Sequence, residues 1–113
     1  MTHEMKLQPK YFDFIKNGTK RIELRLFDDK RKAILLGETI RLIKEPERLE
    51  SIEVTVTGLL RYNTFKELIN DFNIKILADS SISKEELLNN LEMFYSKEEQ
   101  EKYGVLGIRF EII

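Results

Sequence analysis

The sequence predicts an α+β fold in which a sheet of about five strands curls into a small, partly open barrel flanked by helices. The predicted elements run strand, helix, three strands, helices, strand, which is not the regular alternation of a doubly wound sheet. The long fourth strand contains Gly58, where a bulge or a barrel bend can form. The chain has 113 residues, which predicts a single domain over 1–113 with one core and one principal site.

The N-terminal third begins with a strand and a helix. Met5–Gln8 alternates in polarity and stops at Pro9, a residue that favours the first turn of a helix. The helix is predicted to run to Gly18, because Asn-Gly is typical of a helix end. Its apolar stripe, expected in the core, consists of Tyr11, Phe12 and Ile15. His3 is expected in a frayed terminus.

The next predicted strand, Lys20–Leu26, carries four charges in seven residues. Its period of two places the apolar residues Ile22, Leu24 and Leu26 on one face. The opposite face carries Arg21, Glu23 and Arg25, which must find water, each other or a ligand. Lys20 shares the parity of the apolar residues, so we expect it to point toward the packed side or into a cavity.

The remaining strands follow from alternation as well. Asp28–Lys32 is interpreted as a charged turn or a short helical connection, a pattern that usually means a solvated loop. Thr39–Lys44 and Ser51–Tyr62 are predicted strands, and Val105–Ile113 is the last one. In each of them apolar residues alternate with polar ones, which predicts one packed face and one open face.

Three helices are predicted between the fourth and the last strand. Each begins with Ser or Thr followed three residues later by Glu, the pattern of a capping box. The first covers Thr64–Phe72, the second starts at Ser83, and the third starts at Ser96 and ends before Gly104. Apolar residues at helical spacing in the first two predict amphipathic helices that pack against the sheet.

Charge and composition exclude several classes of function. The net charge is −1, so the whole molecule offers no strong electrostatic footprint for a polyanion. The distribution is uneven, with a net +3 over residues 1–62 and −4 over 63–113. The basic half could therefore meet a nucleotide phosphate. The acidic helices over 83–102 leave open recognition of a protein partner.

The usual catalytic and metal-binding side chains are scarce. The chain has no cysteine and one histidine, which excludes disulfides, thiolate zinc sites and a histidine-dependent triad. Its glycines do not form a phosphate-binding loop. We therefore expect no metal and no cofactor. No apolar run approaches the roughly 20 residues that span a bilayer, and the first residues lack the apolar stretch of a signal peptide. A cytoplasmic protein, plausibly monomeric, is expected.

The cluster Lys20, Arg21, Glu23 and Arg25 has two interpretations from its residues alone. In one, Glu23 pairs with a neighbouring arginine on an exposed strand face, which is the more common outcome for this spacing. In the other, Lys20 and Arg25 donate to a phosphate or a base edge while Glu23 accepts. A buried Lys20 could also have a shifted pKa and act as a base.

At these residues the sequence resembles the ASCH domain family of the PUA-like superfamily. The family pattern is similar to G-x-K-x-x-E-x-R, which stands complete as Gly18, Lys20, Glu23 and Arg25. The context matches too, with IKNG before it, GETI at the entry to the next strand, and FYS and YGVLGI near the end. The resemblance therefore spans almost the whole chain.

This resemblance implies a PUA-like β-barrel with flanking helices, a cleft beside the motif strand, and binding of RNA or a nucleotide. The implied ligand-binding residues are Gly18, Lys20, Glu23 and Arg25. An aromatic such as Tyr62 or Tyr103 is expected to stack on a base. Arg21 lies outside the pattern and is expected on an exposed face.

A second activity is implied by part of the family. Some small bacterial ASCH proteins are amidohydrolases that deacetylate N4-acetylcytidine. Their site resembles a lysine, a threonine three residues on, and a carboxylate further along the chain. Lys20 matches the lysine, but Glu23 stands at the threonine position and removes the hydroxyl. No residue of this chain clearly matches the later carboxylate; Asp71 and Glu67 are the candidates. An enzyme would then need Lys20 and Glu23 as catalytic residues that activate water.

Overall fold

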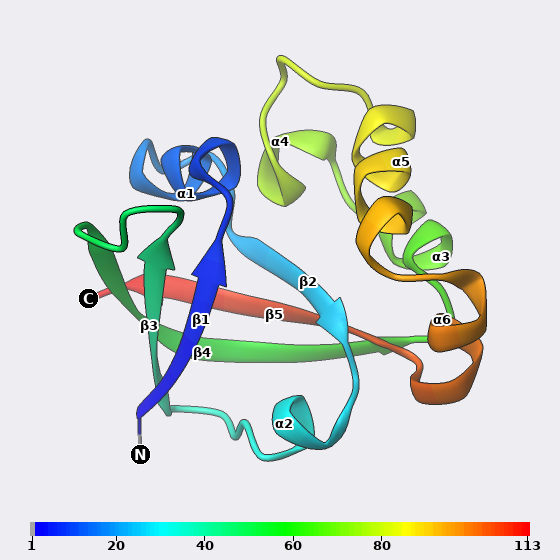
Figure 1. The fold of residues 1–113 in the computed structure, drawn as a ribbon, viewed down its shortest axis with the longest axis horizontal. Coiled ribbons are helices and arrows are strands. Elements are labelled where there is room, and N and C mark those ends of the chain that lie inside the picture. Colours follow the sequence, from blue (N-terminus) through cyan, green and yellow to red (C-terminus); the bar gives the residue numbers. More distant parts are fainter. Residues whose placement is uncertain (1) are drawn as a thin grey trace.

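A computed structural model describes residues 2–113 of the chain. Its strands form one five-stranded sheet that curls into a half-barrel (Figure 1). The strands are β1 (Thr2–Leu7), β2 (Ile22–Leu26), β3 (Thr39–Lys44), β4 (Ser51–Tyr62) and β5 (Val105–Ile112). The order across the sheet is β1-β3-β4-β5-β2, with β1 and β3 parallel and the other pairs antiparallel. The predicted α+β half-barrel is confirmed.

Six helices flank this sheet in the part of the chain that the structure describes. They are α1 (Pro9–Lys16), α2 (Asp29–Lys32), α3 (Phe65–Asn70), α4 (Ile74–Leu77), α5 (Lys84–Phe94) and α6 (Lys97–Tyr103). Figure 1 shows α3, α5 and α6 gathered beside the end of β4, and α2 beyond the end of β2. The chain between β4 and β5 therefore builds the helical side of the molecule.

The two edges of the sheet, β1 and β2, approach each other across the opening of the half-barrel. The Arg25 side chain on β2 spans this gap, because its Nη2 donates to the Lys6 carbonyl of β1 at 2.8 Å. A closed barrel would have backbone hydrogen bonds here. The opening instead leaves room for side chains between the two edges.

Two apolar cores lie on the two faces of the sheet. The first fills the half-barrel and consists mainly of Met5, Leu7, Phe12, Ile15, Ile34, Ile40, Leu42, Val54, Val56, Leu106, Ile108 and Phe110. The second lies between the outer face and the helices, and it contains Ile22, Leu24 and Leu26 together with residues of α3, α4 and α5. The apolar face of β2 thus faces the helices, so its charged face points toward the opening of the half-barrel.

Several local predictions are confirmed by the structure. The pairing of β4 with β5 shifts register between Val56 and Gly58, which is the expected bulge. Ser96 and Glu99 form both hydrogen bonds of a capping box at the start of α6. At α3 and α5, Thr64 and Ser83 each accept a hydrogen bond from the backbone of the first turn, which is one of the two hydrogen bonds of the predicted capping box.

Other predictions are corrected. The motif strand begins at Ile22 rather than Lys20, and 74–77 forms α4, which no capping pattern had indicated. His3 is not frayed, because it lies in β1 and its Nε2 is 2.8 Å from Glu38 Oε1. The connection after β2 takes the helical one of its two expected forms, because it contains the short helix α2, whose first turn is capped by the Asp28 side chain accepting from the Arg31 backbone. Within residues 2–113 the helices all fall short of the length and apolarity that a bilayer crossing requires.

Candidate functional site

The segment that carries the motif is held between α1 and α4. Gly18 follows α1 with a φ of +85°, a conformation that glycine adopts without strain. Thr19 donates through Oγ1 to the carbonyls of Phe14 and Ala78, both at 3.1 Å. The backbone N–H of Lys20 donates to the same Phe14 carbonyl. Gly18 therefore contributes the turn after α1, and hydrogen bonds fix Lys20 in place just before β2 begins.

Lys20 is almost completely buried, with an exposed fraction of 2%. Its Nζ donates to the carbonyls of Ile22 at 2.6 Å and Leu77 at 2.8 Å, and it lies 3.3 Å from Glu23 Oε1. Burial lowers the pKa of Lys20, while the Glu23 carboxylate opposes that shift. Three acceptors match the three N–H groups of an ammonium, so the surroundings satisfy the charged form.

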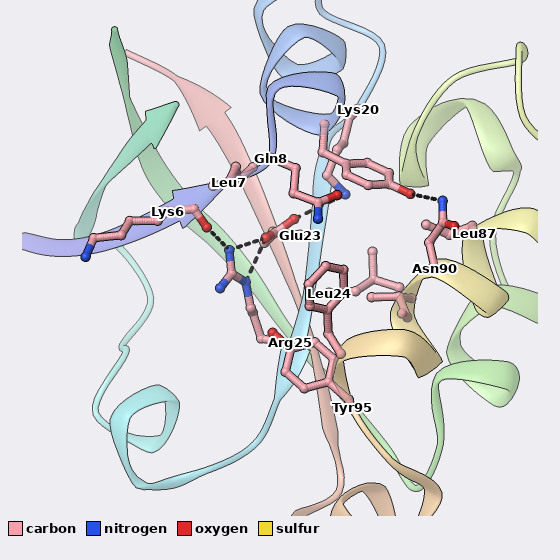
Figure 2. A pocket seen from close by; sticks show the side chains of 13 residues that line it. Lys6, Leu7, Gln8, Lys20, Glu23, Leu24, Arg25, Leu87, Asn90 and Tyr95 are labelled. Atoms are coloured by element: carbon pink, nitrogen blue, oxygen red, sulfur yellow. Dashed lines mark hydrogen bonds and ion pairs between the residues drawn. The ribbon is translucent and has the colours of Figure 1, made fainter. Parts of the chain in front are cut away.

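Glu23 is held between two cations (Figure 2). Arg25 Nε and Nη2 each lie 2.7 Å from Glu23 Oε2, while Glu23 Oε1 faces Lys20. Burial by itself would raise the pKa of Glu23, but Arg25 and Lys20 together hold that pKa below its ordinary value. The pKa of Arg25 is raised in turn, because the Glu23 carboxylate outweighs the effect of burial. Both groups are therefore ionised, and the network carries a net positive charge.

The charged residues of the motif segment thus form a buried network, with one further residue exposed. Glu23 and Lys20 are buried and Arg25 is mostly buried, whereas Arg21 is exposed. The predicted pairing of Glu23 with Arg25 is present, but inside the half-barrel opening rather than on an exposed face. Lys20 points into a buried position, as its parity predicts.

A cavity of about 220 Å³ lies in front of this network. The residues that line it come from the end of β1 and the residue after it, from β2 and the segment before it, from α1, and from α5 and the residue after it. They are Lys6, Leu7, Gln8, Tyr11, Lys20, Glu23, Leu24, Arg25, Leu87, Asn90, Leu91, Phe94 and Tyr95. The cavity therefore has a charged end, formed by Lys20, Glu23 and Arg25, and aromatic and aliphatic walls (Figure 2).

Two polar residues join the helices across one wall of the cavity. Asn90 Nδ2 on α5 donates to the Tyr11 hydroxyl on α1 at 2.9 Å. Because the Tyr11 oxygen accepts this hydrogen bond, the Tyr11 hydroxyl proton can still donate. The side-chain carbonyl oxygen of Asn90 can still accept, so both remain as polar groups on the lining of the cavity. The wall thus offers a neutral donor and a neutral acceptor beside the charged end.

The two tyrosines predicted to stack on a base lie elsewhere. Tyr62 and Tyr103 line a second, more open concavity of about 720 Å³, together with Arg61, Lys102 and residues of α3 and α6. The Tyr62 hydroxyl donates to Asp71 Oδ2 at 2.6 Å. The structure therefore brings Lys20, Glu23 and Arg25 together, keeps Gly18 as the turn behind them, and separates the two tyrosines from them.

Sequence reasoning missed Tyr11, Asn90 and Tyr95 as residues of the cavity. Tyr11 was expected in the core, yet it lines the cavity with its hydroxyl bonded to Asn90. A signal for Asn90 exists in the sequence, because this residue falls between Leu87 and Leu91 on the apolar stripe of α5. A polar residue in such a stripe indicates a polar partner or a cavity. Among residues 2–113, no group of three or more His, Cys, Asp or Glu could hold a metal ion.

Comparison with known proteins places the chain in a family. The model of the ASCH domain matches residues 5–113. The protein belongs to the ASCH domain family. Curated proteins offer no match to this chain.

Solved structures share the fold of this ASCH protein over its full length. The crystal structure of hypothetical protein PH0355 is 38% identical with a TM-score of 0.86, and each chain is covered completely. The solution structure of PF0455 from Pyrococcus furiosus is 32% identical with a TM-score of 0.76, covering 100% of this chain and 98% of the other. A serine-to-alanine variant of ZmASCH from Zymomonas mobilis has a TM-score of 0.62 at 12% identity, covering 97% of this chain and 67% of the other, and it shows the fold alone.

Proposed function

We propose that this ASCH protein binds RNA or a nucleotide by accepting one unpaired nucleobase into the cavity beside β2. The observation that carries the proposal is the cavity itself, which combines aromatic walls with the charged end formed by Lys20, Glu23 and Arg25. Its volume of about 220 Å³ is smaller than the ~300–1,000 Å³ of sites for drug-sized ligands. A site of this volume suits a single base or nucleoside better than a larger ligand.

The lining suits a base in its chemistry as well. Unpaired bases are recognised by stacking on aromatic rings and by hydrogen bonds to their edges. Tyr11, Phe94 and Tyr95 supply the rings, and Glu23 and Asn90 supply acceptors. Arg25 supplies donors that suit a base edge or a phosphate oxygen.

Binding fits the state of the charged groups better than catalysis does. A general base works best with a pKa near the working pH, but two cations hold the pKa of Glu23 below its ordinary value. Lys20 has three acceptors around its ammonium and would have to lose a proton from a fully satisfied site to act as a base. The alternative, an amidohydrolase acting on N4-acetylcytidine, would need one of these two groups to take up a proton.

The test is a panel of nucleosides, nucleotides and short RNAs, including N4-acetylcytidine. Binding is read by calorimetry and thermal shift, and turnover by chromatography. The matched variants are Asn90→Ala and Asn89→Ala, because both residues lie on α5 but only Asn90 lines the cavity. We expect Asn90→Ala to weaken binding about tenfold, the cost of one lost hydrogen bond to a ligand, and Asn89→Ala to bind as the unmodified protein does.

Three outcomes would overturn the proposal. If no member of the panel binds, or if both variants bind equally well, the cavity is not the site. If N4-acetylcytidine is hydrolysed and a folded Glu23→Gln protein loses that activity, the protein is an amidohydrolase in which a glutamate replaces the threonine of the family.

A further inference from the structure

A second arginine lies across the sheet from Arg25, which belongs to the charged end of the cavity. Arg25 on β2 and Arg61 on β4 are both paired with Leu106 of the strand between them. Residues directly opposite one another in a sheet share a face, so both arginines lie on the face of Leu106. Two strand spacings put their backbones about 9–10 Å apart. The positive charge of the cavity is therefore not isolated.

Next to Arg61 lies the aromatic ring of Phe27, with two cations over it. Phe27 follows Arg25 at i+2, which puts it on the same face about 6.6–6.8 Å further along the chain. The Arg61 guanidinium carbon lies 4.0 Å from the centre of the Phe27 ring, and Lys32 Nζ lies 5.7 Å from it. We refer to Phe27, Lys32 and Arg61 as the Phe27 cluster.

Arg61 is available to a ligand. The side chain is exposed, and the ion pairs of residues 2–113 do not include it. With one side of its guanidinium over Phe27, the other side is open to solvent, where a base can stack and a phosphate can accept its N–H groups. Held on the ring, the guanidinium loses less freedom when it binds than a fully mobile side chain does.

Arg61 also belongs to the second concavity. It lines that concavity together with Tyr62, Lys102 and Tyr103. This concavity thus combines cations with aromatic rings, the combination by which single-stranded nucleic acid is bound.

We propose that the ligand is a single-stranded RNA segment, one base of which enters the cavity while the adjoining nucleotide contacts the Phe27 cluster. The inference rests on the proposed function of the cavity and deepens it, because a free nucleoside can reach only the first of the two sites. Arg61 holds the phosphate and stacks on the base of the second nucleotide. The local pair of arginines supplies the binding energy that a molecule of net charge −1 lacks as a whole.

The test compares a nucleoside with a short RNA homopolymer of the same base, for the unmodified protein, Arg61→Gln and Arg109→Gln. Arg109 is the matched control, because it is an exposed arginine of the sheet whose guanidinium lies 6.0 Å from the Phe72 ring, away from the cavity and the cluster. Affinities are measured by calorimetry for the nucleoside and by fluorescence anisotropy for the homopolymer, at several salt concentrations.

We expect the unmodified protein to bind the homopolymer more tightly than the nucleoside. Arg61→Gln should lose about tenfold on the homopolymer, the order of one stacked base, with unchanged affinity for the nucleoside. Its slope of log affinity against log salt should become shallower by about 0.7, the value for one phosphate contact on a single strand. Arg109→Gln should leave the affinity and the slope as they are.

The outcomes separate the two proposals. Equal affinity for nucleoside and homopolymer, or equal losses in Arg61→Gln and Arg109→Gln, would overturn the second site and leave the nucleobase cavity standing. Failure of the nucleoside and the homopolymer alike to bind would overturn both. If the homopolymer binds while the nucleoside does not, and Asn90→Ala has no effect, the cavity is not a binding site and the proposed two-site arrangement is wrong as well.

Discussion

Two ion-pair networks of similar geometry occupy very different surroundings in this protein. In the buried network, Glu23 lies 2.7 Å from Arg25 and 3.3 Å from Lys20. In the surface network, Glu50 lies 2.7 Å from Lys16 and 3.8 Å from Lys44. The side chains of Lys20 and Glu23 are 2% and 10% exposed, whereas those of Lys16 and Glu50 are 58% and 47% exposed.

The distance between two charges does not by itself decide how much an ion pair contributes to stability. Water screens the surface network and competes for its hydrogen bonds, so forming or losing a pair there changes little. In the buried network each charge has already lost its water, and the partners are all that compensates for that loss. The buried network is therefore costly to break, and it is also the one that lines the cavity.

The largest effect is expected from Glu23→Gln. This substitution keeps the shape of the side chain but leaves Lys20 and Arg25 as two buried cations without their carboxylate. We expect a loss of about 3–5 kcal/mol in the free energy of unfolding, as for other broken buried pairs. Urea unfolding followed by circular dichroism measures it. A loss as small as that of a surface substitution would show that water reaches the network.

A smaller effect is expected from Lys20→Met. The methionine fills the volume of the lysine stem, and Glu23 keeps Arg25, but the carbonyls of Ile22 and Leu77 lose their donor. We expect a loss of about 1–3 kcal/mol, the cost of buried acceptors without partners. The same urea experiment tests this, and a variant as stable as the unmodified protein would show that the ammonium is not needed to satisfy these carbonyls.

Acid should weaken the buried network through Glu23. The pKa of Glu23 is lower in the folded protein than its ordinary value, so the unfolded chain binds more protons between the two values. Stability from this group is therefore full above about pH 4.3, the ordinary pKa of glutamate, and is lost as the pH falls through the lowered value. Unfolding measured from pH 6 down to pH 2.5 should show a shallower acid loss in Glu23→Gln, and an unchanged loss would contradict the pairing.

The smallest effect is expected from Glu50→Gln in the surface network. The pKa of Glu50 is also lowered, first of all by its hydrogen bond with Lys16, but the group is exposed. We expect the urea midpoint to stay close to that of the unmodified protein, and the remaining difference to vanish when salt is added. A loss comparable with that of Glu23→Gln would mean that burial is not what separates the two networks.

Local patterns in the sequence predict much of this fold because they depend on neighbours in the chain. Alternation predicts β4, and the glycine within that strand predicts its bulge at Gly58. The pattern Ser-x-x-Glu predicts the start of α6 at Ser96. The short helix α4 is missed, since four residues carry too little periodicity. The pairing of His3 with Glu38 is missed because it joins β1 to the loop before β3, far apart in sequence.

The sequence by itself determined that Lys20, Glu23 and Arg25 belong together, because they lie within six residues of one strand and one turn and complete a family pattern. Only the tertiary structure decided that their charges are buried, since burial depends on α4 reaching Lys20 and on β1 approaching Arg25. It also decided that Tyr11 and Asn90, rather than Tyr62 and Tyr103, line the cavity. A sequence records the side of an element on which a residue lies, whereas the element that faces it is set by packing across the whole chain.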